Sequence, residues 1–260
     1  MAITTTRPKP LTFSERTEQI LPDNNNLLQM FMRDMENFAT SNNMKINSSK
    51  TKIMKISRVT RMDFPLEISL SNKVQLEVVN TIKILGILIN DRLKWDENTE
   101  YLCAKARRKI WLLRNMKMSG LTQIQLLDAY KKEVRSLLEL SVPVWSSGIT
   151  VEQNDQFERV QRSALSAILG PKYVSYDQAL KSTNLERLSI RREKICIKFI
   201  RKNMKSDRPL LKVKNKTHAT RSNPKFAEEI QCRTKAYFDS SVPYLARLYN
   251  SHMKMKSKIK

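Results

Sequence analysis

The sequence has few of the residues that build metal centres, disulfide frameworks or catalytic triads. Its three cysteines lie far apart in the chain, and it has only two histidines. A zinc site needs closely spaced ligands and a disulfide scaffold needs paired cysteines, so neither is predicted. A histidine-based metal centre or a Ser-His-Asp triad would require a long-range coincidence around one of two imidazoles.

Long hydrophobic runs are also missing. The longest apolar stretch, residues 84–89, is interrupted by Gly86 and is far shorter than a membrane-spanning helix. The polar N-terminus has no apolar region of the kind found in signal peptides. We therefore expect an intracellular protein, in the nucleus or the cytoplasm, without a membrane partner.

Positive charge is what the sequence has in excess. The 260 residues carry 48 Lys plus Arg against 25 Asp plus Glu, a formal net charge of +23. Residues 1–90 hold 12 basic and 8 acidic side chains, whereas residues 91–260 hold 36 and 17. A field of this size attracts polyanions over long distances. Nucleic acid is the predicted partner, and most of the attraction comes from the second part of the chain.

The hydrophobic pattern predicts an α+β fold that is mainly helical. Residues 1–26 show no periodicity, so we expect a flexible leader there. Residues 27–95 are predicted to form a helix that covers a small sheet. The apolar stripe of that helix consists of Leu28, Phe31, Met35 and Phe38, and Asn42-Asn43 suits its end. The predicted strands are 44–46, 52–56, 66–70, 74–79 and 81–89.

Beyond residue 95 the pattern becomes helical. We expect helices in residues 96–140 and 141–206, followed by a basic tail, residues 207–260, whose polar, lysine-rich composition permits disorder. Two helix starts carry the spacing of a capping box, Thr122 with Gln125 and Thr150 with Gln153. Gly170-Pro171 is predicted to end the helix that the second box opens.

One of these helices is strongly basic. Its apolar stripe is formed by Leu102, Ala106, Ile110 and Leu113. Its other faces carry Lys105, Arg107, Arg108 and Lys109. Such charges either track a nucleic-acid backbone, which makes binding strongly salt-dependent, or form a solvated helix face. The charge excess of the region favours phosphate contact.

Further candidates lie in the second basic cluster, which runs from residue 191 to residue 205 and includes Arg191, Arg192 and Lys194. We give this cluster the same interpretation. Two tryptophans, Trp111 and Trp145, have the rings needed to stack on bases. Both lie among apolar neighbours in the sequence, so we predict that they pack in the core instead.

Residues 42–52 contain the pattern Asn47-Ser48-Ser49-Lys50-Thr51, residues 82–95 contain Ile84-Leu85-Gly86-Ile87, and residues 142–148 contain Val142-Pro143-Val144-Trp145. Taken in order with later segments, these three stretches resemble the reverse transcriptases of jockey-like non-LTR retrotransposons over about residues 27–252. The first, residues 42–52, is similar to motif D of that family through its pattern Asn47-x-x-Lys50-Thr51. The second, residues 82–95, resembles the Leu-Gly strand of motif E, the primer grip. The third resembles the region after the thumb and the usual end of the reading frame, in residues 142–148, 158–162, 168–170, 191–194, 220–222 and 243–245.

The resemblance implies a partial palm sheet at 27–95 and a helical thumb at 96–140, with RNA, DNA or an RNA-DNA hybrid as partner. It also implies that Lys50 could donate a proton to departing pyrophosphate and that Lys52 lies near nucleic acid. We favour the simpler interpretation of Lys50, a turn lysine exposed to water. Leu85 and Gly86 would support a primer terminus, unless Gly86 only relieves crowding in a buried strand.

The departure from the family concerns catalysis. The paired-aspartate box that precedes the motif D helix has no counterpart, and neither has the earlier metal-binding aspartate. Asp23 lies near the expected position but lacks the strand-turn-strand context. Two-metal phosphoryl transfer needs carboxylates that hold both cations. We therefore predict no complete catalytic site and no cofactor in this chain, with Mg²⁺ expected only for the intact parent polymerase.

The expected function is that of a fragment of an RNA-directed DNA polymerase that retains nucleic-acid binding. The missing palm and fingers portion would be a further partner. Two alternatives stay open. One is an unrelated basic module that binds nucleic acid without sequence preference, and the other is a degenerate relic with no activity.

Overall fold

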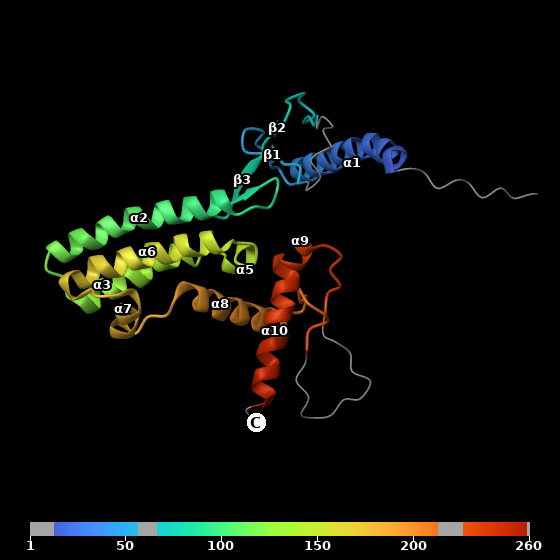
Figure 1. Ribbon diagram of the computed structural model, residues 1–260. Coiled ribbons are helices and arrows are strands. Elements are labelled where there is room, and N and C mark those ends of the chain that lie inside the picture. Colours follow the sequence, from blue (N-terminus) through green and yellow to red (C-terminus); the bar gives the residue numbers. More distant parts are fainter. Residues whose placement is uncertain (1–12, 57–66, 213–225, 259–260) are drawn as a thin grey trace, which may run out of the picture. The chain divides into compact units, whose positions relative to one another are not determined.

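The computed structural model describes residues 13–56, 67–212 and 226–258 (Figure 1). The described chain is mainly helical with small sheets, as the α+β prediction expects. It divides into two compact units. The first contains the described residues up to Ile82 together with Asn90–Leu93, and the second contains Lys83–Ile89 and the described residues from Lys94 onward.

The first unit begins with helix α1, Phe13–Ser41. The prediction of a flexible leader is therefore wrong for residues 13–26, and residues 1–12 lie outside the described part. Extending an existing helix is much easier than starting one, so a polar segment without periodicity can continue a helix that its neighbours stabilise. The predicted end is confirmed, because Asn43 follows Ser41 with a left-handed φ of +56°.

A small core holds the first unit together. Ile68, Leu70 and Leu76 are buried there, and Met32 of α1 packs against them. The predicted inward stripe of α1 is wrong, because Leu28, Phe31, Met35 and Phe38 are 40–61% exposed. The core is too small to cover a broad helix face.

The strands of the first unit are short. β1, Lys52–Ile53, pairs in parallel with β2, Glu77–Val78, and Ser69 forms an isolated antiparallel bridge with Gln75. The predicted strand at 44–46 does not form. The segment after Ala39 instead leaves the helix through a turn, in which the Met44 N–H donates to the Ala39 carbonyl at 2.8 Å.

The predicted strand 81–89 is divided into a hairpin. β3, Thr81–Ile84, and β4, Ile87–Asn90, are joined by Leu85 and Gly86, whose φ angles are +48° and +90°. Positive φ at both central residues is the geometry that matches the twist of a two-residue hairpin. Both earlier interpretations of Gly86 placed it inside a strand, and the structure places it in the turn.

From Asp96 onward the second unit is built of helices. They are α2 (Asp96–Met118), α3 (Gln123–Ala129), the π-helix η1 (Tyr130–Arg135), α4 (Ser136–Leu138), α5 (Val142–Trp145), α6 (Val151–Leu169), the 3₁₀ helix η2 (Gly170–Lys172), α7 (Tyr176–Thr183), α8 (Leu188–Asn203), α9 (Lys235–Phe238) and α10 (Ser241–Lys258). Both predicted capping boxes are confirmed, and α6 ends before Gly170 as predicted. No helix in the described residues is both long and apolar enough to span a membrane.

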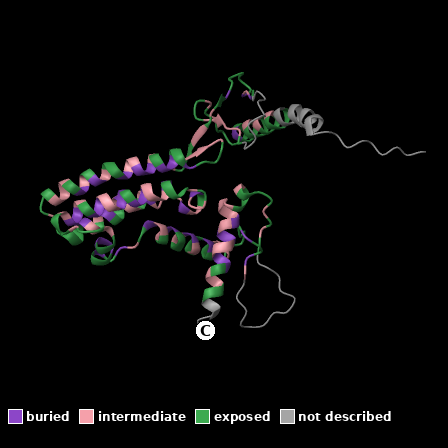
Figure 2. Ribbon diagram, in the orientation of Figure 1, coloured by how far each residue is buried: buried purple, intermediate pink, exposed green. Residues whose placement is uncertain are grey.

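The core of this unit forms where α2 packs along α6 (Figure 1). The predicted stripe of α2 is confirmed, since Leu102, Ala106, Ile110 and Leu113 are all buried. Figure 2 shows the buried residues of α2 on its side toward α6 and the exposed residues on the opposite side. Trp145 of α5 stacks on Phe157 of α6 with ring centroids 5.0 Å apart, so the core prediction for Trp145 is confirmed.

The last part of the chain also belongs to this core. Helix α10 packs on α8, and Leu245, Ala246 and Tyr249 are buried. The side chain of Asn250 accepts from the Ala227 N–H at 2.8 Å and donates to the Ala227 carbonyl at 3.0 Å. The expected basic tail, whose composition permits disorder, is instead partly folded within residues 207–212 and 226–258, while residues 213–225 and 259–260 lie outside the described part. Burial of three apolar residues of α10, together with Leu211 and Ala227, outweighs the polar composition.

Replacing Phe157 by Ala should lower the free energy of unfolding by about 3–5 kcal/mol, because the change removes a fully buried ring and leaves a cavity beside Trp145. Chemical denaturation followed by circular dichroism measures this loss. Val151→Ala on the same helix is the control, since Val151 is 87% exposed and should change stability by no more than about 0.5 kcal/mol. Equal effects of the two substitutions would contradict the packing described here.

Candidate nucleic-acid interface

The four basic residues predicted on α2 have different environments. The Lys105 ammonium lies 5.1 Å from the centre of the Tyr101 ring, and Lys83 lies 4.8 Å from the same ring. Their hydrogen bonds, that of Lys83 first, lower the pKa of the Tyr101 hydroxyl. Lys109 pairs with Glu133 at 2.9 Å. Lys105 and Lys109 therefore already interact with neighbouring side chains.

Arg107 and Arg108 are exposed, and neither pairs with a carboxylate of the described residues. Arg114 is exposed in the same way and was not predicted. Trp111 lies between them and is 65% exposed. We call these four residues, Arg107, Arg108, Trp111 and Arg114, the α2 outer face.

The core prediction for Trp111 is wrong, for a geometric reason. Successive residues of an α-helix are rotated by about 100° around its axis, because a turn takes 3.6 residues. Ile110 and Leu113 occupy the inward positions. Trp111 is next to Ile110 in the sequence but points to a different side. Trp111 lies three or four positions from Arg107, Arg108 and Arg114 in the sequence. This spacing is the sequence signal that identifies the α2 outer face.

Arg191 and Arg192, which were predicted to contact nucleic acid, instead interact with other residues of the second unit. Arg191 donates to both carboxylate oxygens of Glu139, with its Nη2 3.0 Å from Oε2, and this raises the pKa of Arg191. Arg192 is buried, and its guanidinium lies over the Phe157 ring at 5.3 Å. Arg192 is therefore not available for contact with a phosphate backbone, and that prediction is wrong. Burial lowers the pKa of Arg192.

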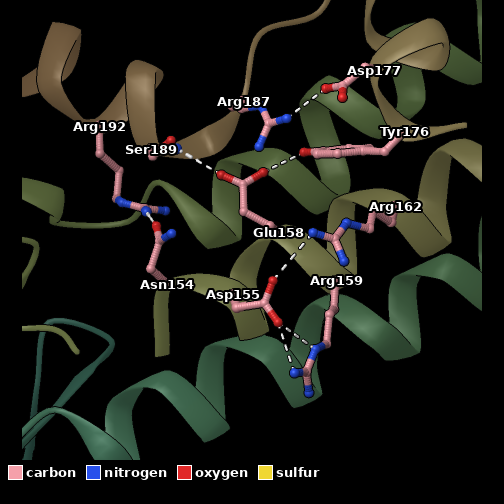
Figure 3. A network of polar contacts seen from close by, with 10 residues as sticks. All are labelled: Asn154, Asp155, Glu158, Arg159, Arg162, Tyr176, Asp177, Arg187, Ser189 and Arg192. Carbon is pink, nitrogen blue, oxygen red and sulfur yellow. Dashed lines mark hydrogen bonds and ion pairs between the residues drawn. The ribbon is translucent and has the colours of Figure 1, made fainter. Parts of the chain in front are cut away.

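A polar network beside Arg192 joins α6, α7 and α8 (Figure 3). The buried carboxylate of Glu158 accepts from the Ser189 N–H at 2.9 Å and from the Tyr176 hydroxyl. Burial, followed by the hydrogen bond to Glu158, raises the pKa of Tyr176. Arg192 donates to Asn154 at the edge of the network. These polar groups connect the helices to one another, and their partners lie inside the protein.

The outward side of α8 forms a second basic surface. A groove of about 820 Å³ lies along α8, with His252 of α10 at its wall. We call it the α8 groove. Its cationic lining consists of Lys194, Lys198, Arg201, Lys202 and Lys205. Lys194 pairs with Glu186. Of the predicted basic cluster, the residues from Lys198 to Lys205 therefore contribute more to this surface than Arg191, Arg192 and Lys194 do.

The remaining predicted residues lie in short turns and strands. Lys50 is exposed in the turn that follows Asn47, whose side-chain oxygen accepts from the Lys50 N–H at 3.2 Å. Lys52 pairs with Glu77 across the β1–β2 ladder. Leu85 is 90% exposed at the hairpin turn. A Cβ at Gly86 would lie 3.1 Å from a methyl group of Leu140. The hairpin turn therefore packs closely against Leu140, which belongs to the same unit as Gly86.

Within the described residues, no three His, Cys, Asp or Glu side chains gather in a way that could hold a metal ion. The described residues therefore do not supply the clustered carboxylates that a two-metal polymerase site needs. Comparison of the chain with models of known families, with curated proteins and with solved structures finds no match. The resemblance to reverse transcriptases thus stays a prediction.

Replacing Tyr176 by Phe should lower the free energy of unfolding by about 1.5–3 kcal/mol, because the buried Glu158 carboxylate loses a donor while the ring stays in place. Thermal and urea unfolding measure the change. Tyr173→Phe is a matched control, since the Tyr173 hydroxyl has no hydrogen bond to a described residue. If both substitutions leave stability unchanged, the Glu158 network does not stabilise the fold.

Proposed function

We propose that this chain binds RNA, DNA or their hybrid through the phosphate backbone, without sequence preference, and that the α2 outer face is the main contact surface. The observation that carries the proposal is the set of three exposed arginines, Arg107, Arg108 and Arg114, on one helix. None of them pairs with a carboxylate of the described residues. A guanidinium matches the geometry of a phosphate and binds it through two hydrogen bonds.

The charge distribution supports the same function. Residues 91–260 hold 36 of the 48 basic side chains, so the field that attracts a polyanion comes mostly from the part that carries α2 and α8. Several cations of this region are neutralised locally, as in the pairs Lys132–Asp128 and Arg159–Asp155. The arginines of the α2 outer face pair with no carboxylate of the described residues, whereas the α8 groove also contains Glu193, and its Lys194 pairs with Glu186.

We further propose that the chain is a fragment of a retrotransposon reverse transcriptase that retains binding and lacks catalysis. The ordered resemblance over residues 27–252 supports this ancestry. One observation favours the second candidate, an unrelated basic nucleic-acid-binding module: the described strands form two separate two-stranded sheets and not one palm sheet. The proposed interface is the same in both cases.

The triple substitution of Arg107, Arg108 and Arg114 by Ala should weaken binding to a labelled RNA-DNA primer-template and flatten its salt dependence. Each phosphate contact that is lost lowers the slope of log K against log salt by about one. Fluorescence anisotropy over a series of salt concentrations measures both quantities.

The control for this experiment is a second triple variant, with Lys132, Arg159 and Arg187 changed to Ala. It removes the same number of charges, but each of these residues pairs with an aspartate, Asp128, Asp155 or Asp177. It should reduce long-range attraction equally while it keeps the slope closer to that of the unchanged chain. The proposal is wrong if the two variants behave alike, or if the unchanged chain binds no primer-template at low salt.

The purified chain should not extend a primer when supplied with deoxynucleotides and Mg²⁺, because it lacks the paired aspartates that would hold the metal ions. A primer-extension assay on a gel measures this, with a known polymerase as positive control. Extension that persists after further purification would show that the chain has a catalytic centre, and it would overturn the proposal of a binding-only fragment.

A further inference from the structure

Trp111 differs from the other tryptophans of this chain. Trp145 is fully buried and Trp95 is 8% exposed, whereas Trp111 is 65% exposed. Tryptophan has the largest apolar surface of any side chain, and most of that surface is normally removed from water. A ring this open on a regular helix adds nothing to the core of the unit.

The neighbours of Trp111 on the helix surface are arginines. Residues three and four positions apart on a helix are adjacent, with Cβ atoms about 5–6 Å from each other. Arg107 and Arg108 precede Trp111 by four and three positions, and Arg114 follows it by three. The indole therefore lies in the middle of the cationic cluster, with guanidinium groups before and after it along the helix axis.

We propose that Trp111 is a stacking platform for an unpaired base, and that the α2 outer face therefore prefers single-stranded RNA or DNA to the interior of a duplex. A base stacked on the indole would place its flanking phosphates near Arg107 or Arg108 on one side and Arg114 on the other. This inference rests on the proposed function and narrows its ligand from any nucleic acid to strands with exposed bases.

The preference for single strands follows from the geometry of the bases. Inside a duplex, both faces of each base are covered by its neighbours, so no face is open to an indole. In a single strand the face of a base can be exposed at small cost, and every base has one, so stacking is tolerant of sequence. Duplex DNA can still contact the arginines through its phosphates, but it gains nothing from the ring.

The charges around Trp111 argue against an apolar protein partner. Covering the ring with an apolar surface would also remove water from the three guanidinium groups and leave them without counter-charges, which is costly. A phosphate backbone supplies the counter-charge at the same time as the base covers the ring. The arrangement therefore fits a ligand that alternates flat apolar groups with anions.

The test compares an oligo(dT) strand with a long blunt duplex, each labelled for fluorescence anisotropy. Trp111→Ala should weaken binding of the strand by about tenfold, the effect of losing one stacked base, and should leave binding of the duplex unchanged. Trp111→Phe should keep part of the affinity for the strand. Met118→Ala is the matched control. Met118 is 86% exposed on the same helix, but only one arginine, Arg114, lies three or four positions from it.

Intrinsic fluorescence gives a second and independent measurement. Because Trp95 and Trp145 are buried, quenching by iodide reports mainly on Trp111. Oligo(dT) should quench the emission of the unchanged chain and protect it from iodide, and the duplex should do neither. The Trp111→Ala chain should show no such changes.

Several outcomes would overturn the inference. Equal losses for strand and duplex, no loss for the strand, or binding of the strand without a change in emission would each exclude stacking. If ligand-free Trp111→Ala sediments as a smaller species than the unchanged chain, the ring is a contact between copies of the protein. In any of these cases, binding of the duplex can still depend on salt and on the three arginines. The proposed nucleic-acid binding then stands, and only the stacking role of Trp111 is excluded. If the unchanged chain binds neither ligand, both fail.

Discussion

The packing of α2 along α6 determines which side chains of the second unit meet water. Leu102, Ala106 and Ile110 are removed from solvent in this contact, and their burial fixes the rotation of α2 about its own axis. Burial of apolar surface contributes about 25 cal/mol per Å², so a face of five or more buried residues outweighs any single surface preference. Once this rotation is set, the helical spacing places Arg107, Trp111 and Arg114 on the solvent-exposed side of α2. The proposed interface is therefore a consequence of the core.

Helix packing also separates two kinds of cation that look alike in the sequence. A buried or half-buried cation must have a partner, because an unpaired charge away from water is costly. Arg191 therefore lies against Glu139, and Arg192 lies over the aromatic rings of the core. Exposed cations such as Arg107 and Arg114 of α2 and Arg201 of α8 pair with no carboxylate of the described residues. Arg191 and Arg192 thus make their contacts within the second unit, while Lys198, Arg201 and Lys202 line a groove open to an anion.

The first unit has a different balance. A two-stranded sheet is marginal by itself, and β1 with β2 depends on the small core of Ile68, Leu70 and Leu76 for support. This core leaves Phe31, Met35 and Phe38 exposed on α1. In the reverse-transcriptase proposal, the missing palm would have covered such a face.

Local signals in the sequence predicted several features that depend on neighbouring residues, although the hairpin turn at Leu85-Gly86 was missed. The capping boxes at Thr122 and Thr150, the stop at Gly170, the end of α1 near Asn43 and the apolar stripe of α2 could all be predicted, because each depends on residues within one or two helical turns. The excess of positive charge likewise needs no structure. Predictions failed where distant residues decide. Trp111 was assigned to the core from its sequence neighbours, residues 226–258 were assigned to a tail from their composition, and Arg192 was counted as a surface charge. Whether a side chain is covered depends on which other element packs against it, and only the tertiary structure decided that α6 covers Ile110 and leaves Trp111 among unpaired arginines.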